Sequence, residues 1–304
     1  MEDKKRLIII DSNALLHRAF HALPPLTTQK GEQTGAVYGF LLILFKAIKD
    51  LQADYIVACF DTKAPTFRHE QFKEYKAQRP KTPDAIISQM PIIKEVLGAL
   101  EIPVFLKEGF EADDLIATIS QLALQQDDSV EIYILSGDLD NLQLVSERIK
   151  VYTLGKGIKD TVLYNKDRVI SRFGVTPEQM NDFKALAGDS SDNISGVPGI
   201  GKKTAADLIK QFGTIENLYK EIGEGMANIK TRIKDLLLDN KKNAYLSKKL
   251  VETKKDVAIQ FQLQNCKFGD FNPKAAEELL KKLEFNTLIG RLSSLLEINE
   301  TRPR

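Results

Sequence analysis

The chain has 304 residues, 43% hydrophobic and 28% charged, which is typical of a globular protein with one large domain or two domains. Its net charge of +1 excludes no class of partner by itself. The longest apolar run, at 39–45, is too short for a membrane span, which needs about 18–20 residues, and the first residues lack the layout of a signal peptide.

Short apolar runs rich in β-branched residues alternate with helical patterns in the first half of the chain. Helical periodicity is present at 36–51, 84–100 and 112–126. Because strands that alternate with helices form parallel sheets, we expect an α/β fold with a mostly parallel central sheet flanked by helices. The expected strands are 6–10, 55–60, 102–106, 130–135 and 149–154.

From about residue 175, short helical segments punctuated by glycine replace the strands. We therefore expect an α/β domain at 1–175 and a smaller helical domain at 176–290. Residues 291–304 end in the polar sequence NETRPR and are expected to form a tail or linker.

Acidic residues follow the expected strands at the point where each strand ends. Asp11 directly follows the first strand, and Asp61 directly follows the second. In an open parallel sheet the carboxyl ends of the strands form the edge where ligands bind, so these acids are expected to converge there. The segment GDSSDN adds two more acids from the start of the helical part. The full set is Asp11, Asp61, Glu111, Asp113, Asp114, Asp138, Asp140, Asp189 and Asp192.

Nine converging acids would repel one another strongly unless cations were bound between them. With only three histidines and two cysteines in the chain, the available ligands are carboxylates, which suit Mg²⁺ or Mn²⁺. We therefore predict a centre of two or more such ions that acts on a phosphoryl group. In the alternative interpretation, the acids of GFEADDLIATI (109–119) only cap a helix, and Asp114 in particular fits a capping or indirect role.

The glycine-rich segment 195–213, SGVPGIGKKTAADLIKQFG, predicts two helices joined by a tight turn at Gly199 and Gly201. It fails the P-loop pattern because Lys203 stands where that motif requires Ser or Thr, and no apolar strand precedes it. Free N–H groups at the second helix, with Lys202 and Lys203 beside them, are expected to hold a phosphate backbone. The alternative is an ordinary interhelical turn with solvated lysines.

Basic residues gather in two segments. Residues 63–81 hold six Lys or Arg against two Glu and follow Asp61 closely. Lys76 and Arg79 project to one side if this segment is helical, so we predict a phosphate clamp beside the acidic centre in preference to a solvated basic surface. Residues 227–255 hold nine Lys or Arg against three acids, and DNA contact and a solvated helix are equally good interpretations there.

Five motifs occur in order along nearly the whole chain: IDSNALLHRAFHAL, FDTKAPTFRHEQFKEYKAQR, GFEADDLIATI, SGDLDNLQLV and GDSSDNISGVPGIGKKTA. Together they closely resemble the 5′-nuclease domain of bacterial DNA polymerase I, in the flap endonuclease family. No acidic position of the family pattern is missing.

The resemblance implies a structure-specific nuclease of DNA replication and repair that uses two metal ions. It would hydrolyse phosphodiesters at 5′ ends, flaps and nicks of branched duplex DNA and would remove RNA primers. The nine acids would be metal ligands or their near neighbours. Lys76 and Arg79 would contact the scissile phosphate from a basic arch at about 63–84, Tyr75 would stack on a base, and Arg18 would contact DNA near the site.

The same resemblance implies that 189–213 is a helix-hairpin-helix that binds duplex DNA and holds K⁺ through carbonyls of its turn. Its DNA-binding residues would be Gly199, Gly201, Lys202 and Lys203. The sequence stops at Arg304, where a polymerase of this kind would continue, so the expectation is either a fragment of such a polymerase or a stand-alone nuclease. The resemblance implies a polymerase domain as a partner, in the same or another chain. We further expect a monomer in the bacterial cytoplasm, with no membrane partner.

Two other functions compete with this interpretation. A non-catalytic DNA-binding relative would gain from losing acids near phosphates, yet all nine are present. A metal-dependent ribonuclease could use a similar sheet, but the basic segment and the glycine hairpin favour duplex DNA.

Overall fold

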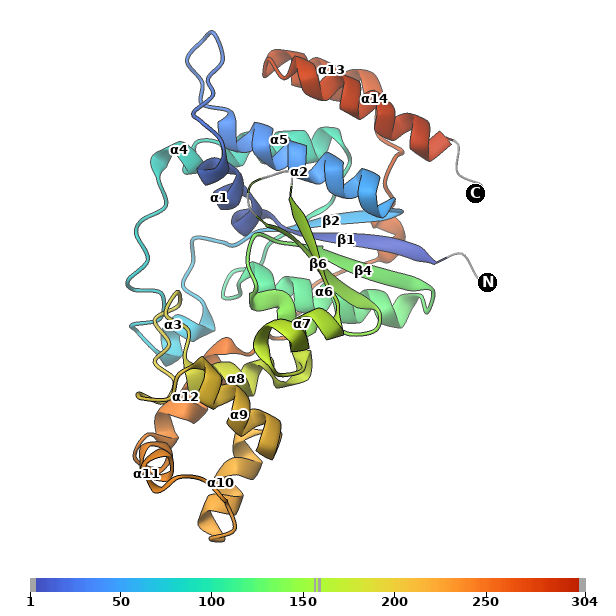
Figure 1. Ribbon diagram of the computed structural model, residues 1–304. Helices are drawn as coiled ribbons and strands as arrows, with labels where there is room; N and C mark the ends of the chain where they lie inside the picture. Colours follow the sequence, from blue (N-terminus) through green and yellow to red (C-terminus); the bar gives the residue numbers. More distant parts are fainter. Residues whose placement is uncertain (1–3, 156, 158–159, 301–304) are drawn as a thin grey trace.

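The computed structural model describes residues 4–155, 157 and 160–300. Within these residues a six-stranded sheet has the order β3-β2-β1-β4-β5-β6 (Figure 1). All neighbouring strands are parallel except β6, which pairs antiparallel with β5 at one edge. The expected mostly parallel sheet is therefore confirmed. The strands are β1 (Lys5–Asp11), β2 (Tyr55–Cys59), β3 (Val104–Phe105), β4 (Val130–Leu135), β5 (Ile149–Leu154) and β6 (Thr161–Tyr164).

The central strand β1 separates two hydrophobic cores. Leu7 and Ile9 pack into the core on one face of the sheet, and Ile8 and Ile10 pack into the core on the other. All four side chains are fully buried. Helices on both faces explain why residues 7–10 of this strand are all apolar instead of alternating.

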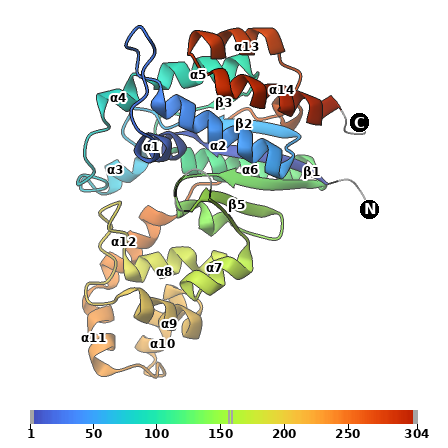
Figure 2. The same ribbon diagram turned by 45° about the horizontal axis from the view of Figure 1, so that its top comes forward.

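Helix α6 (Ala112–Gln126) packs into the first core, and α1 (Ser12–Ala22), α2 (Gly35–Leu51) and α5 (Met90–Ala99) pack into the second (Figure 2). The single helix expected at 84–100 is divided into α4 (Asp84–Ile87) and α5. Pro91 lies at the start of α5 and cannot supply the N–H that a continuous helix would need there.

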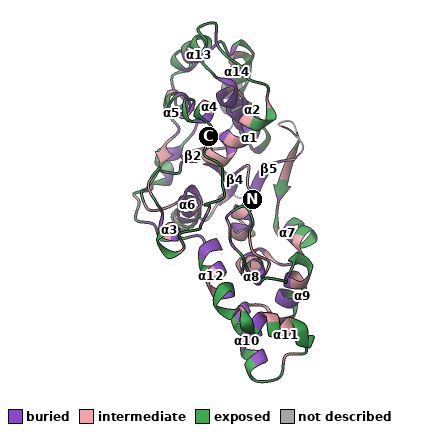
Figure 3. Cartoon of the chain, turned by 90° about the vertical axis from the view of Figure 1, so that its left-hand side faces the viewer, coloured by how far each residue is buried: buried purple, intermediate pink, exposed green. Residues whose placement is uncertain are grey.

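Helices follow the last strand and lie below the sheet in Figure 1. Their inner faces are buried and their outer faces are exposed (Figure 3). Phe183 and Leu208 belong to the same core as Ile116 of α6, so this region packs continuously against one face of the α/β part. The elements are α7 (Lys166–Phe173), η2 (Pro177–Gln179), α8 (Met180–Ala187), α9 (Lys202–Phe212), α10 (Ile215–Gly223), α11 (Thr231–Asp239) and α12 (Lys241–Val251).

After α12 the chain returns to the α/β part, which the sequence did not predict. A short helix, η3 (Leu263–Cys266), lies beside β2, and α13 (Pro273–Lys282) and α14 (Asn286–Glu300) cover the face that also carries α2 and α5. The last part of the helical domain expected at 176–290 therefore packs into the second core of the α/β part instead.

The tail expected at 291–304 is wrong over the part that the structure describes. Helix α14 continues to Glu300, and Leu292 and Leu295 are buried in the second core. Residues 301–304 lie outside the described residues. None of the described helices is both long and apolar enough to cross a membrane.

Candidate active site

The acids predicted from the strand ends lie at the carboxyl edge of the sheet. Asp11 is the last residue of β1, and Asp61 follows β2 after one intervening residue. Glu111 and Asp113 stand at the start of α6, the helix that comes after β3. Asp138 and Asp140 follow β4, with Asp140 opening the short helix η1 (Asp140–Leu144), and Asp189 and Asp192 lie in the loop after α8.

Electrostatic repulsion links eight of the nine predicted acids into one cluster. Asp11 is repelled by Asp61 and Asp138, and Asp61 by Glu111. Asp113 is repelled by Asp11, Asp138 and Asp140. Asp140 is repelled in turn by Asp138, Asp189 and Asp192. The structure thus brings together acids from five separate segments, and only Asp114 stands outside the cluster.

Burial makes Asp11, Asp113 and Asp140 of this cluster hold protons more tightly than ordinary carboxylates. Loss of hydration and the neighbouring negative charges raise the pKa of Asp11 to about 7 and that of Asp140 to about 6. The same two causes raise the pKa of Asp113. A divalent cation would remove this cost, because it supplies the positive charge that the carboxylates lack.

Protein cations already neutralise several of the acids. In the part of the chain that the structure describes, no three His, Cys, Asp or Glu side chains are arranged to hold a metal ion as they stand. Lys76 Nζ lies 2.7 Å from Glu111 Oε1, and Arg79 pairs with Asp192. A metal centre would require some of these carboxylates to exchange a protein cation for an ion.

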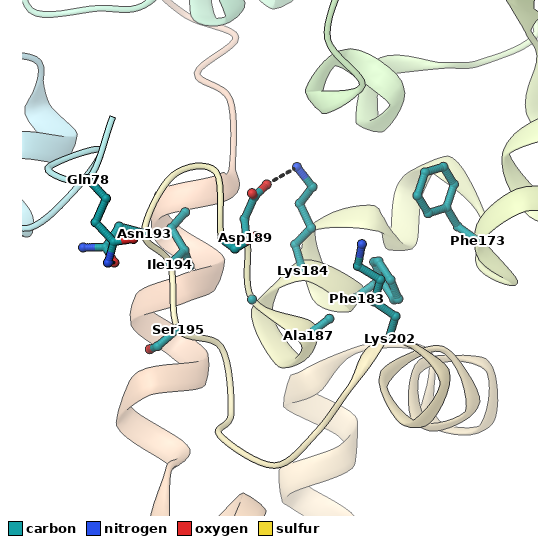
Figure 4. Close-up of a pocket in the computed structure, with 12 residues that line it drawn as sticks. Gln78, Phe173, Phe183, Lys184, Ala187, Asp189, Asn193, Ile194, Ser195 and Lys202 are labelled. Carbon is teal, nitrogen blue, oxygen red and sulfur yellow. Dashed lines mark hydrogen bonds and ion pairs between the residues drawn. The ribbon is translucent and has the colours of Figure 1, made fainter. Parts of the chain in front are cut away.

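Lys184 is a member of this cluster that the sequence reasoning missed. It extends from α8 and its Nζ lies 2.6 Å from Asp140 Oδ1 and 2.8 Å from Asp189 Oδ2. Burial of Asp189 opposes its ionisation, but the Lys184 ammonium prevails and lowers the pKa of Asp189 to about 2. Figure 4 shows Lys184 directed at Asp189 beside a hollow of about 440 Å³, which Gln78 of the arch and Lys202 also line.

Three of the described residues directly follow site acids in the sequence and carry buried polar atoms without a partner. Among the described residues, Ser12 Oγ, Thr62 Oγ1 and Asn141 Oδ1 are buried and lack a hydrogen-bond partner. They directly follow Asp11, Asp61 and Asp140 in the sequence. Asn141 donates to Asp113 Oδ1 over 2.9 Å, which fixes the orientation of that carboxylate. An all-oxygen site with spare acceptors suits Mg²⁺ or Mn²⁺.

The basic arch meets the acids, although it is not the continuous helix that the spacing assumed. Helix α3 (Phe67–Gln71) ends before Lys76, and residues 73–79 form turns in which Lys76 has a φ of 57°. The N–H of Lys76 donates to the carbonyl of Asp192 over 3.0 Å. Lys76 and Arg79 therefore both lie against Asp192 because the chain turns here, and not because they share a helical face.

Tyr75 is buried in this structure, whereas the family resemblance implied a ring that stacks on a base. Its side chain is 3% exposed, and its hydroxyl lies 3.1 Å from Glu111 Oε2 and 3.0 Å from Asp192 Oδ2. A base could stack on this ring only after the arch moved. Here Tyr75 joins the arch to two acids from different parts of the chain.

Asp114 does not fit the role of a metal ligand. It is fully buried, and Arg68 Nη1 and Nη2 each donate to one of its oxygens over 2.8 Å. The N–H groups of Glu111 and Lys254 donate to the same two oxygens. Its acceptor sites are therefore occupied by protein donors, and the indirect role left open by the sequence agrees with this geometry.

The glycine-rich segment forms the end of the loop 188–201 between α8 and α9, with a turn at Gly199, followed by α9 itself. The expected short turn between two helices is therefore part of a longer connection that also carries Asp189 and Asp192. Gly199 has a φ of 88°, and a Cβ there would lie 3.0 Å from Leu236 Cδ1. Gly201 precedes α9 without a side-chain cap, and Lys202 and Lys203 are exposed on the first turn. These free N–H groups and two ammonium groups at one helix end favour a bound anion.

Arg18 lies near the site but is already engaged, since its guanidinium donates to the carbonyl of Gly155. The sequence reasoning missed Arg68, Lys184 and Asn141. Arg68 lies in the basic segment and Asn141 follows two site acids, so the sequence offered a signal for both residues. Lys184 carried no comparable signal, because it lies on an ordinary amphipathic helix.

Comparisons of sequence identify relatives along almost the whole chain. Residues 6–174 match the family described as "5′-3′ exonuclease, N-terminal resolvase-like domain", and residues 175–284 match "5′-3′ exonuclease, C-terminal SAM fold". DNA polymerase I of Bacillus subtilis is 41% identical over 96% of this chain and 33% of its own length. A 5′-3′ exonuclease of Aquifex aeolicus is 38% identical over 96% of both chains. The chain thus spans about a third of the polymerase relatives it matches.

Solved structures share the fold at low sequence identity. The zinc-bound T5 5′-exonuclease has a TM-score of 0.66 and 22% identity, over 97% of this chain and 99% of that one. The catalytic core of Rad2 in complex with DNA substrate has a TM-score of 0.62 and 16% identity, over 96% and 93% of the two chains. At these identities the likeness establishes the fold.

Proposed function

Because the chain belongs to the 5′-3′ exonuclease family, we propose that it is a divalent-metal-dependent, structure-specific 5′ nuclease. Its substrates would be 5′ ends, flaps and nicks of branched duplex DNA, and RNA primers, in replication and repair. The observation that carries the proposal is the cluster of eight carboxylates with Lys76 and Arg79 directly against it.

The chemistry of the donor set favours two or more Mg²⁺ or Mn²⁺ ions. When bound, such ions supply an activated water and stabilise negative charge on the reacting phosphoryl group. Asp140 and Asp189 would hold an ion only in competition with Lys184, since that ammonium now contacts both carboxylates. The residues proposed to hold the ions are Asp11, Asp61, Glu111, Asp113, Asp138, Asp140, Asp189 and Asp192, without Asp114.

Lys76 and Arg79 are the proposed catalytic cations of the chain itself. In this structure they compensate Glu111 and Asp192, and a phosphate that enters the site would compete for the same two cations. Charge increases on the phosphoryl oxygens as the transition state forms. A cation placed in a partly dehydrated site therefore stabilises the transition state more than the bound substrate.

The hairpin after α8 is the proposed contact for the duplex. The uncapped N-terminus of α9 offers N–H groups to a phosphate, and Lys202 and Lys203 add charge. Contacts of this kind hold the backbone without reading bases, which suits an enzyme that selects DNA by its branched structure. A K⁺ ion at the turn and a base stacked on Tyr75 remain predictions, as does a contact from Arg18.

The chain's partners follow from the same proposal. The relatives named DNA polymerase I support a polymerase domain, in the same or another chain, that would create the flaps cleaved here. We propose that the nuclease itself acts as a monomer in the bacterial cytoplasm.

The direct test is incubation with a 5′-labelled flap duplex, with and without Mg²⁺, followed by sizing of the products. We expect cleavage near the junction that stops on addition of chelator. Cleavage of a matched all-RNA duplex without cleavage of the DNA flap would show a ribonuclease. Binding of the DNA without any cleavage in Mg²⁺ or Mn²⁺ would show a non-catalytic relative. Either of these results would contradict the proposal.

A further inference from the structure

Arg68 is the buried cation at the base of the arch. It lies in α3, only 2% exposed, and therefore cannot contact DNA or solvent from its present position. A buried guanidinium needs acceptors for its N–H groups, because an unpaired buried charge is strongly destabilising. The identity of those acceptors shows which parts of the molecule depend on Arg68.

The acceptors come from two segments distant in sequence. Nη1 and Nη2 donate to the Asp114 carboxylate over 2.8 Å each, in the paired geometry that only arginine offers. Nε donates to the carbonyl of Leu250 and Nη2 to that of Glu252, both over 2.8 Å. One side chain on the arch thus connects the start of α6 with the segment that leaves α12.

Asp114 completes the connection from the other side. Its Oδ1 accepts the N–H of Lys254 over 2.8 Å, and its Oδ2 accepts the N–H of Glu111 over 3.0 Å. Arg68 Nη1 also lies 3.4 Å from Glu111 Oε2. The backbone and the carboxylate of Glu111 are therefore both held by this pair.

Glu111 is in turn the residue that receives the arch. Lys76 Nζ lies 2.7 Å from its Oε1, and the Tyr75 hydroxyl lies 3.1 Å from its Oε2. The arch thus contacts Glu111 near its centre through Lys76, and it is fixed at its base by Arg68. The relative position of Lys76 and the acidic cluster depends on both attachments.

We infer that Arg68 is a positioning residue, which through Asp114 keeps the arch, the start of α6 and residues 250–254 in one fixed arrangement, so that Lys76 is delivered to the site. Its effect on cleavage rests on the proposed function, whereas the arrangement itself does not. Arg68→Lys keeps the charge but loses the planar fork, so it cannot serve the carboxylate and both carbonyls. Arg148→Lys is the matched control, since Arg148 donates to the carbonyls of Asp127 and Val130, outside the acidic cluster.

The first experiment measures amide hydrogen exchange by mass spectrometry, which requires no nuclease activity. In Arg68→Lys we expect faster exchange together in peptides covering 66–76, 111–116 and 250–256, and in Arg148→Lys no change there. In the wild-type chain, exchange measured at increasing urea concentrations should give the same opening free energy and urea dependence for all three peptides, as expected of one shared opening. This arm remains available if Arg68→Lys fails to fold, and separate openings of the three segments would overturn the inference.

The second experiment measures single-turnover cleavage of the flap duplex with saturating enzyme. Displacement of a catalytic group by about 1 Å can cost about 100-fold in rate, so Arg68→Lys should lose about 10- to 100-fold with duplex affinity changed less than about threefold. Lys76→Ala should then cost at least about tenfold less in the Arg68→Lys background than in the wild-type chain. An equal cost in both backgrounds would overturn the inference. A wild-type chain that cleaves no flap would instead refute the proposed function and leave the exchange result standing.

Discussion

Lys76 Nζ lies 2.7 Å from Glu111 Oε1, so the arch places a cation directly on an acid of the candidate centre. The contact is largely shielded from solvent, because the Lys76 side chain is 21% exposed and that of Glu111 10%. Burial opposes the charge of Lys76, but Glu111 and Asp192 raise its pKa above the ordinary value. The lysine is therefore charged at neutral pH and available to a phosphate.

Lys76→Ala should lower the single-turnover rate of flap cleavage far more than it lowers DNA affinity. In the ground state this lysine is one cation among several, so binding should weaken slightly and the salt dependence should fall by about one unit. In the transition state it faces the increased charge on the phosphoryl oxygens, and its loss should cost about 100- to 1,000-fold. Raising the DNA concentration should not restore the rate.

Lys63→Ala is the control for this prediction, because Lys63 is exposed at the edge of the same segment. It should change the cleavage rate and the affinity by less than about threefold. If saturating DNA returned full rate to Lys76→Ala as well, the arch would be a basic binding surface without a catalytic role.

Asp113→Asn should abolish turnover without abolishing DNA binding. The substitution removes one ionised ligand from the cluster at little steric cost, and we expect a loss of several orders of magnitude in rate. Binding should survive or tighten, since a negative charge near the phosphates is lost. Asp128→Asn, at a fully exposed acid, should keep the full rate.

Metal ions should separate binding from chemistry in the same assay. Cleavage should require Mg²⁺ or Mn²⁺ and stop with chelator, whereas Ca²⁺ should support binding alone because of its longer and looser coordination. Equal cleavage rates in Mg²⁺ and in chelator would refute the metal centre.

The metal-free protein should lose stability as pH rises from about 4 to about 7. Burial and the negative neighbours raise the pKa of Asp11 from 3.8 to about 7 and that of Asp140 from 3.8 to about 6. Between pH 3.8 and these raised values, Asp11 and Asp140 bind more protons in the folded chain than in the unfolded chain, so their contribution to the unfolding free energy falls as the pH rises. Once both acids are ionised, a divalent cation should restore the loss.

Thermal unfolding with and without Mg²⁺ at pH 5.5 and pH 8 measures this linkage. The increase in Tm on adding Mg²⁺ should be larger at pH 8, since at pH 5.5 the ion must first displace protons. Asp11→Asn should flatten the pH profile of the metal-free protein because it removes the group with the higher pKa. An equal Mg²⁺ effect at both pH values would show that these acids do not bind the ion.

The sheet and the acidic edge were predictable because their signals are local. Strands β1, β2, β4 and β5 are mostly apolar and rich in β-branched residues. An acid that follows a parallel strand lies at the carboxyl edge of the sheet, where the other strand ends also lie. The returning helices α13 and α14 were not predictable in this way. Their apolar faces fit any core, and only the tertiary structure shows that they cover the face opposite α6.

The pairing of charges inside the site was also beyond the sequence. Arg68 and Asp114 are 46 residues apart, and Lys184 and Asp140 are 44 apart, so no helical or strand spacing connects them. Sequence patterns identify which residues are charged. Which acid meets a metal ion and which meets an arginine depends on packing between distant segments, as Asp114 illustrates.

Gly199→Val should weaken duplex binding while bound substrate is still cleaved at nearly the normal rate. Gly199 has a φ of 88°, which a β-branched residue adopts only at a cost of about 1–3 kcal/mol, and its Cβ would press on Leu236 at 3.0 Å. The turn should shift and move the N–H groups of α9 away from the phosphate. Gly225→Val is the matched control, because Gly225 has a φ of 74° in the turn after α10 with open space around it. It should lose similar stability without losing affinity, so a filter-binding or fluorescence measurement on the two folded variants separates strain from DNA contact. Unchanged affinity in Gly199→Val would leave this segment an ordinary turn between two helices.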